Sequence, residues 1–276
     1  MDMINIGDAD LAVWVENPRT DGVENPGAAP VFLVSGLGGR AAFWSELVPA
    51  LSDQFQVVTH DHRGTGASTK SEIAYSVPQM AKDVLSLMDA LEIEKTAMVG
   101  HSTGGAIAQH LALNHADRLS RIVLSATWAG PSPYFKALFD LRLQVLQDSG
   151  PEAYLMDGIL RAYPADVLTE TPSLLTGTRE ERLAAFPGLT IEAARIAAVQ
   201  GHDLRDQVSN ITLPTLVIAA ADDQITPVGF SDELAGLIPG AEKVILPHGG
   251  HFVPRVSTAA YNSAVVSFLT QPATEA

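Results

Sequence analysis

Short apolar runs recur along this chain, and most of them are followed by a stretch with helical spacing. Seven runs have the length and composition of buried strands: 11–15, 31–34, 56–59, 96–99, 122–124, 216–219 and 244–246. Between two of them, residues 79–91 place apolar side chains such as Met80, Val84 and Leu87 every three or four positions. This alternation predicts an α/β fold, with a mostly parallel twisted sheet and helices on both faces.

Between about residues 132 and 207 the short apolar runs no longer occur, and only helical periodicity continues. Prolines interrupt that stretch at four places, Pro151, Pro164, Pro172 and Pro187, so we expect several helices rather than one. The sequence therefore predicts a helical insertion before the last strands of the sheet.

Composition narrows the functional classes. With 276 residues and 46% hydrophobic content, the chain can bury a large core, and without cysteine it has no disulfide, thiolate metal site or cysteine nucleophile. A formal net charge of −15 opposes binding to nucleic acid and to anionic membrane surfaces. No apolar stretch approaches the roughly 18 residues of a membrane span, and the N-terminus lacks an export pattern. We expect a cytoplasmic protein with a small-molecule substrate; the sequence does not indicate an oligomeric state.

The most informative motif is Gly-His-Ser-Thr-Gly at residues 100–104, which lies between a predicted strand and a predicted helix. A G-x-S-x-G sequence in this context is typical of a nucleophile elbow, in which a sharp turn exposes the serine at the tip of the strand. We therefore expect Ser102 to be a catalytic nucleophile.

A serine hydroxyl needs a histidine to take its proton and an acid to orient that histidine, and after this motif the acid precedes the histidine. The predicted strand 216–219 is followed by two adjacent acids, Asp222 and Asp223. Beyond them only His248 and His251 remain as bases. His251 is favoured because two glycines precede it and let its loop fold over the strand ends, whereas His248 fits an ordinary surface loop.

Two backbone N–H groups are expected to bind the developing oxyanion. One belongs to Thr103, directly after the candidate nucleophile. The other is expected from the glycine-containing loop 35–39, where Leu37 is the candidate donor.

These elements in this order resemble the α/β-hydrolase superfamily, in the small bacterial branch that includes 3-oxoadipate enol-lactone hydrolase and aminoacrylate hydrolase. The resemblance covers essentially the whole chain and rests on five segments: 35–39, 61–68, 100–104, 223–227 and 249–252. Many members carry a histidine where this chain has Ser35, so we expect no side-chain role there. Asp61 and Arg63 match a family signature that fixes a tight turn and takes no part in the chemistry.

The resemblance implies that Asp223 is the acid of the triad and that Asp222 caps the turn. It also implies a helical cap, with core segments at 1–131 and 208–276 and the cap at 132–207. Aromatic residues near or within the cap are candidates for the substrate cavity, namely Trp128, Tyr134, Phe135, Phe139 and Tyr154, although at helical spacing such residues are often plain core. Three arginines of the cap could bind a carboxylate by charge alone, but a solvated face is the expectation for Arg142, Arg161 and Arg195.

We therefore predict a serine hydrolase that cleaves an ester, lactone, activated amide or carbamate bond of a small molecule through an acyl-enzyme. No metal or cofactor is expected, because no histidine or carboxylate pair shows ligand spacing on one helix. Two alternatives stay open: a non-hydrolytic or perhydrolytic reaction on the same triad, and a ligand sensor of the same fold without turnover.

Overall fold

The computed structural model describes residues 1–20, 23–25, 27–176, 183–184 and 186–272. Within these residues, eight strands form one sheet in the order β1-β2-β6-β5-β7-β8-β9-β10. The strands are β1 (Asp2–Asn5), β2 (Asp10–Glu16), β5 (Pro30–Val34), β6 (Gln56–His60), β7 (Thr96–His101), β8 (Leu119–Ser125), β9 (Thr215–Ala220) and β10 (Glu242–Leu246). A separate hairpin consists of β3 (Arg19–Thr20) and β4 (Val23–Glu24).

Six neighbouring strands, from β6 to β10 in the sheet order, are parallel to one another, and β1 and β2 join them in antiparallel pairs. The predicted mostly parallel sheet is confirmed, and each of the seven predicted runs lies in a strand. The short edge strand β1 was not predicted, because its four residues are largely exposed and show no buried apolar run.

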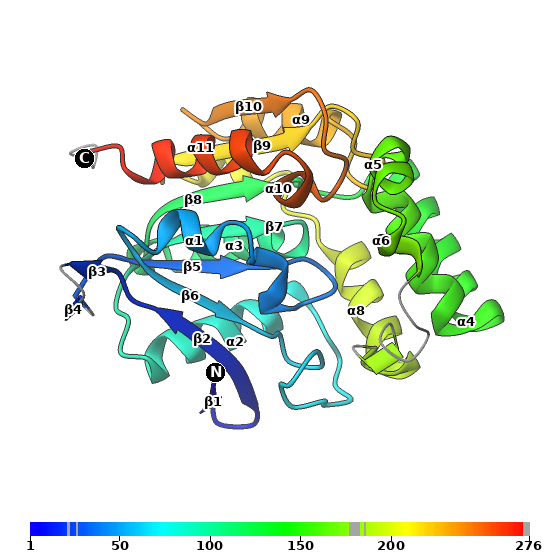
Figure 1. The fold of residues 1–276 in the computed structure, drawn as a ribbon, viewed down its shortest axis with the longest axis horizontal. Coiled ribbons are helices and arrows are strands. Elements are labelled where there is room, and N and C mark those ends of the chain that lie inside the picture. Colours follow the sequence, from blue (N-terminus) through cyan, green and yellow to red (C-terminus); the bar gives the residue numbers. More distant parts are fainter. Residues whose placement is uncertain (21–22, 26, 177–182, 185, 273–276) are drawn as a thin grey trace.

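Helices cover both faces of the sheet (Figure 1). The helices and helical turns are η1 (Ala41–Trp44), α1 (Val48–Leu51), α2 (Val77–Ala90), α3 (Thr103–Asn114), η2 (Ala116–Arg118), α4 (Pro133–Ala162), α5 (Ala165–Glu170), α6 (Ser173–Thr176), α8 (Leu189–Gly201), η3 (Val208–Asn210), α9 (Gly229–Leu237), α10 (Val253–Val256) and α11 (Thr258–Leu269). On β5, Phe32 and Val34 point into the core beneath α2 and α3, whereas Val31 and Leu33 pack with residues of α1 and α11. This two-sided burial explains why the strands read as continuous apolar runs.

The insertion between β8 and β9 is helical, as predicted. Helices α4, α5, α6 and α8 gather at one end of the sheet in Figure 1, away from both termini. The longest of them, α4, changes direction at Gly150, whose φ of 85° interrupts the helix just before Pro151. The division into core and cap at residues 131/132 and 207/208 stays a prediction.

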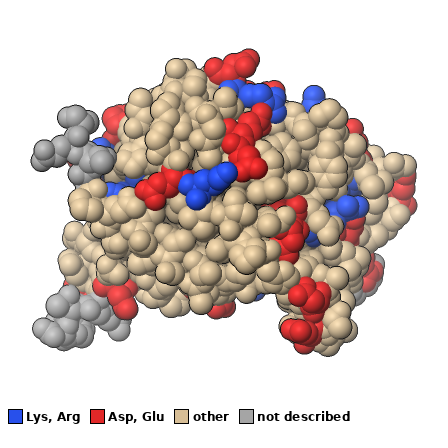
Figure 2. Space-filling view, turned by 90° about the horizontal axis from the view of Figure 1, so that it is seen from above, with Lys and Arg blue, Asp and Glu red and all other residues tan. Residues whose placement is uncertain are grey.

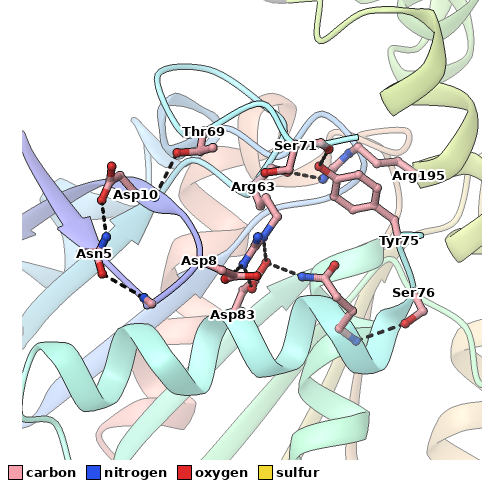
Figure 3. Close-up of polar contacts among 12 residues, drawn as sticks. Asn5, Asp8, Asp10, Arg63, Thr69, Ser71, Tyr75, Ser76, Asp83 and Arg195 are labelled. Atoms are coloured by element: carbon pink, nitrogen blue, oxygen red, sulfur yellow. Dashed lines mark hydrogen bonds and ion pairs between the residues drawn. The ribbon is translucent and has the colours of Figure 1, made fainter. Parts of the chain in front are cut away.

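The loop that follows β6 is pinned by buried charges. Arg63 donates to Asp83 of α2 at 2.8 and 2.9 Å and to Asp8 at 2.6 Å (Figure 3). Asp61 accepts backbone N–H groups from Ala41 and Ala67, both at 2.9 Å. These contacts agree with the expected structural role of the segment, because neither side chain lines the main cavity of the described residues.

Acidic residues outnumber basic ones by 32 to 17, which gives the formal net charge of −15. Figure 2 shows that on one face the acidic side chains are dispersed, with basic side chains between them. Among the described helices, none has the length and apolar composition needed to cross a membrane.

Candidate active site

Ser102 lies in the turn between β7 and α3 with backbone angles φ 53° and ψ −117°. A positive φ is strained for a residue with a side chain, and such strain at a strand tip is typical of a nucleophile elbow. Ser102 is only 7% exposed and lines a cavity, so the expected exposure to the surface is not observed. The turn is held by the Ser102 N–H, which donates to the Ser125 carbonyl at 2.8 Å, and by the Thr127 hydroxyl, which donates to the Ser102 carbonyl at 2.8 Å.

The two glycines of the motif are required by close backbone approach. A Cβ on Gly100 would lie 2.3 Å from the Gly104 carbonyl oxygen, and a Cβ on Gly104 would lie 1.9 Å from the Val34 oxygen. Any side chain at either position would therefore push α3 away from the sheet.

His251 and Asp223 come from two loops that follow neighbouring parallel strands, β10 and β9. His251 Nδ1 lies 2.8 Å from Asp223 Oδ2, and both side chains are buried. The other carboxylate oxygen of Asp223 accepts the N–H groups of Ile225 at 2.7 Å and Thr226 at 2.9 Å. The carboxylate is therefore fixed in one orientation and faces the imidazole.

Asp222 points elsewhere and shapes the histidine loop. Its carboxylate accepts the Gly250 N–H at 2.8 Å and lies 2.8 Å from His248 Nδ1. His248 is 42% exposed at its side chain, which fits the surface position expected for it. Of the two adjacent acids, it is thus Asp223 whose carboxylate contacts His251.

The loop 35–39 passes directly over the elbow. A Cβ on Gly36 would lie 3.1 Å from the Ser102 Cβ, so only glycine lets the loop come this close. Within the described residues, neither the Leu37 nor the Thr103 N–H donates to a backbone carbonyl outside the regular elements. Thr103 is the first residue of α3, whose N-terminal end favours negative charge.

A second imidazole lies beside His251. The His101 ring is 4.9 Å from that of His251, centroid to centroid, and stacks on Phe43 at 4.6 Å. Burial, with the nearby His251 as a smaller cause, holds the pKa of His101 well below the usual value, so this ring stays neutral. His101 therefore packs against the candidate base without adding charge to the site.

Ser102, His251 and Leu37 line one cavity of about 250 Å³. In the described part of the chain Ser102 and His251 share no hydrogen bond, a contact that often tightens only when substrate is bound. The cap contributes Phe139, Arg142, Tyr154, Leu155, Gly158, Ile159, Ala162 and Glu192 to the cavity wall.

Of the five aromatic residues predicted for the cavity, the structure places Phe139 and Tyr154 there. Trp128 is buried against Phe135 at 4.6 Å and His202 at 5.7 Å, between ring centroids, so Trp128 and Phe135 belong to the core. Tyr134 is half exposed, and its hydroxyl donates to the Gln224 carbonyl. Trp128 precedes the cap and the other two lie at its start, and none of the three lines the described wall of the cavity.

The expectation of a solvated face is wrong for two of the three cap arginines. Arg195 is fully buried and donates to the carbonyls of Arg63 at 3.0 Å and Leu37 at 2.8 Å. Arg142 is only 8% exposed and lines the cavity. Glu192, which also lines it, was missed as a site residue. Its helical spacing is the same as that of ordinary core and surface residues, so the sequence carries no distinguishing signal.

Among the described residues, no group of three or more histidine and carboxylate side chains is arranged to hold a metal ion. The chemistry that the arrangement offers is that of a serine, an imidazole and an oriented carboxylate at a cavity mouth.

Comparison with known proteins decides the family. The model of the alpha/beta hydrolase fold family matches residues 29–254. The chain belongs to this family. It is a hydrolase with the architecture that the resemblance implied.

Several relatives cover almost the whole chain. One relative is RutD of Caulobacter vibrioides, which bears the provisional name of a carbamate hydrolase. It is 39% identical to this chain over 88% of this chain and 91% of its own length. The crystal structure of the enol-lactonase from Burkholderia xenovorans LB400 is 30% identical, with a TM-score of 0.83 over 96% of this α/β hydrolase and 98% of that chain. A hydrolase from Pseudomonas aeruginosa PA01 is 31% identical, with a TM-score of 0.83 over 95% of both chains.

Proposed function

We propose that this α/β hydrolase cleaves an ester, lactone, activated amide or carbamate bond of a small molecule through an acyl-enzyme on Ser102. The observation that carries the proposal is the 2.8 Å contact between His251 Nδ1 and Asp223 Oδ2, beside the cavity that Ser102 also lines. A carboxylate in this position holds the proton on Nδ1. Nε2 is then free to accept a proton, as a general base must.

The reaction follows from these positions. Ser102 Oγ attacks the substrate carbonyl carbon while His251 takes the hydroxyl proton, and the Leu37 and Thr103 N–H groups bind the oxyanion. His251 then protonates the leaving group as its bond to the acyl carbon breaks. A water molecule, deprotonated by His251, attacks the acyl-enzyme, and the acid product leaves with Ser102 protonated again. Throughout, Asp223 stabilises the imidazolium that forms.

The named relatives support this class of bond. The name of RutD refers to a carbamate and that of the enol-lactonase to a lactone, and both groups present an electrophilic carbonyl carbon to a nucleophile. The cavity volume of about 250 Å³ favours a small molecule. In this proposal residues 132–207 act as a cap, since α4 and α8 supply a wall of the cavity. A cytoplasmic location and the lack of a nucleic-acid or membrane partner stay predictions.

The test combines turnover with covalent labelling. Steady-state hydrolysis of a panel of activated esters, lactones and carbamates is measured for the wild type, for Ser102→Ala and for Ser120→Ala, an exposed serine of β8. We expect Ser102→Ala alone to lower kcat by about 10⁴-fold or more. A fluorophosphonate probe should add its mass to Ser102 and to no other residue.

Turnover that survives in Ser102→Ala would contradict the proposal. Labelling of Ser102 without hydrolysis of any panel member would instead favour a ligand sensor. Products other than the free acid and its leaving group would indicate a non-hydrolytic reaction on the same triad.

A further inference from the structure

Arg142 is a buried cation in the wall of the cavity that holds the triad. It lies on α4, and its side chain is 9% exposed. The same cavity is lined by Ser102 and His251. One small molecule can therefore reach both the guanidinium and the candidate nucleophile.

The guanidinium has aromatic neighbours, and among the described residues no carboxylate oxygen lies within hydrogen-bond distance of it. Its central carbon lies 4.8 Å from the ring centroid of Tyr154 and 5.7 Å from that of Phe139. The Tyr154 hydroxyl is a polar neighbour of the guanidinium, whose Nε is buried without a hydrogen-bond partner. A Cβ on Gly158 would lie 3.2 Å from Nη2, so the glycine leaves room for the guanidinium at the cavity wall.

Among the described residues Asp157 is the acid within ion-pair distance of Arg142, and it is shared with another arginine. Asp157 Oδ2 lies 3.9 Å from Arg142 Nε, a distance too long for a hydrogen bond. The other oxygen of Asp157 lies 2.7 Å from Arg161 Nε, one helical turn further on. Asp157 is therefore engaged mainly by Arg161, and it leaves the charge of Arg142 incompletely balanced.

The other charged groups near the cavity do not balance it either. Glu192 accepts the Tyr154 hydroxyl at 2.5 Å and forms no ion pair within 4.0 Å among the described residues. Burial raises the pKa of Glu192, which favours its neutral form, although Arg195, the Tyr154 hydroxyl and, as the smallest cause, Arg142 act in the opposite direction. Arg195 adds a second positive charge; its Nη1 and Nη2 donate to carbonyl oxygens, and its Nε is buried without a partner.

A buried guanidinium whose acid is shared and too distant for a hydrogen bond is costly, and in a chain with a net charge of −15 a closer acid could easily have been supplied. We propose that Arg142 binds a carboxylate of the substrate, so that the enzyme acts on small molecules that carry a carboxylate in addition to the carbonyl attacked by Ser102. A carboxylate accepts two parallel N–H bonds from a guanidinium, which fits a planar donor held between aromatic rings. This inference rests on the proposed hydrolase function and specifies its substrate class.

Two matched pairs of esters test the inference, because the carboxylate can belong to either half of the substrate. On the acyl side 4-nitrophenyl butanoate is compared with 4-nitrophenyl hemisuccinate, and on the leaving-group side phenyl acetate is compared with 3-acetoxybenzoate. The readout is the ratio of kcat/KM between the carboxylated and the neutral member of each pair. It is measured for the wild type, Arg142→Met, Arg142→Lys and Arg118→Met. Arg118 is the control, since it pairs with Asp89 and does not line the cavity among the described residues.

In at least one pair we expect the wild type to prefer the carboxylated ester by tenfold or more, Arg142→Met to lose that preference, and Arg142→Lys to keep part of it. Arg118→Met should retain the wild-type ratio. An unchanged ratio in Arg142→Met, or a wild type without any preference, would overturn the inference.

Direct binding separates this inference from the proposed function. Calorimetry measures the affinity of succinate and of 3-hydroxybenzoate for the wild type and for Arg142→Met, without any turnover. Binding of either anion that weakens tenfold or more in Arg142→Met supports the carboxylate site even if no ester is hydrolysed. If Ser102→Ala hydrolyses the esters normally, the proposed mechanism fails while the carboxylate site is still judged by the ratios.

Discussion

Arg195 Nη2 donates to the Leu37 carbonyl at 2.8 Å, a contact between helix α8 of the insertion and the loop that carries the candidate oxyanion donor. The same guanidinium donates to the Arg63 carbonyl at 3.0 Å and lies 5.7 Å from the ring centroid of Tyr75 (Figure 3). Arg195 therefore joins the insertion, the pinned loop after β6 and the loop over the elbow at one point. It reaches none of the reacting atoms, so we regard it as a positioning residue.

Replacing Arg195 by leucine should lower kcat more than it changes KM. Without its anchor the Leu37 N–H loses its fixed position, and a misplacement of about 1 Å is enough for a loss of about a hundredfold. The two freed carbonyls should also lower the free energy of unfolding by about 1–3 kcal/mol. Steady-state kinetics and urea unfolding measure the two effects, and Arg118→Leu, at an exposed ion pair, is the control. A variant that is destabilised but has normal kcat would show that Arg195 has a purely structural role.

Replacing each of the two adjacent acids by asparagine in turn should separate their roles. Asp223→Asn should lower kcat by about 10⁴-fold, because an amide cannot hold the required tautomer of His251 or stabilise its cation. Asp222→Asn should cost at most about a hundredfold, since it only loosens the loop around Gly250. The ratio of the two losses, measured on one activated ester, is the decisive quantity. Equal losses would mean that Asp222 takes part in the chemistry.

The sheet and the order of the candidate triad could be predicted because both leave local signals. Buried parallel strands appear as apolar runs, and the elbow needs glycines at fixed spacing around Ser102. The choice of Asp223 over Asp222 depended on the resemblance, because adjacent residues after a strand differ in direction and not in composition.

Apart from Phe139 and Tyr154, the part of the cavity wall that the cap supplies could not be predicted, because its contacts join residues far apart in the sequence. Arg195 and Leu37 are 158 positions apart, and a single arginine in a helical pattern is normally solvated. For Trp128 the error is the opposite one, because a residue predicted for the cavity lies in the core. No sequence feature of a large aromatic residue just after β8 distinguishes these two positions. It is the neighbouring rings of Phe135 and His202 that place it in the core.

Glycine at the elbow should stabilise the fold relative to alanine. At Ser102 the φ of 53° is strained for alanine by about 1–3 kcal/mol, and this exceeds the entropy that glycine costs, about 0.5–1 kcal/mol. Urea unfolding should therefore find Ser102→Gly more stable than Ser102→Ala by about 1 kcal/mol. In the exposed strand position Ser120 only the entropy acts, so Ser120→Gly should be the less stable of its pair. If the glycine variant is less stable than the alanine variant at both positions, the backbone at Ser102 is not strained.

Stability should fall in mild acid because of buried neutral histidines. Burial lowers the pKa of His60 and of His202 to about 4, whereas in the unfolded chain both protonate near pH 6.5. Between those values the unfolded chain binds more protons, so the free energy of unfolding decreases as the pH falls from about 6.5 to about 4. Over this pH range each group should lower the free energy of unfolding by about 3 kcal/mol, so that the two together lower it by several kcal/mol.

Urea unfolding at a series of pH values from 7.5 to 4.5 measures this slope for the wild type, His60→Phe and His202→Phe. Each variant removes one titrating group from the folded and the unfolded chain alike, so its curve should be shallower than that of the wild type. Val58→Ala, a buried change next to His60 on β6, should lower stability by the same amount at every pH and run parallel to the wild type. Parallel curves for both histidine variants would contradict the assignment, because the acid sensitivity would then arise from other groups.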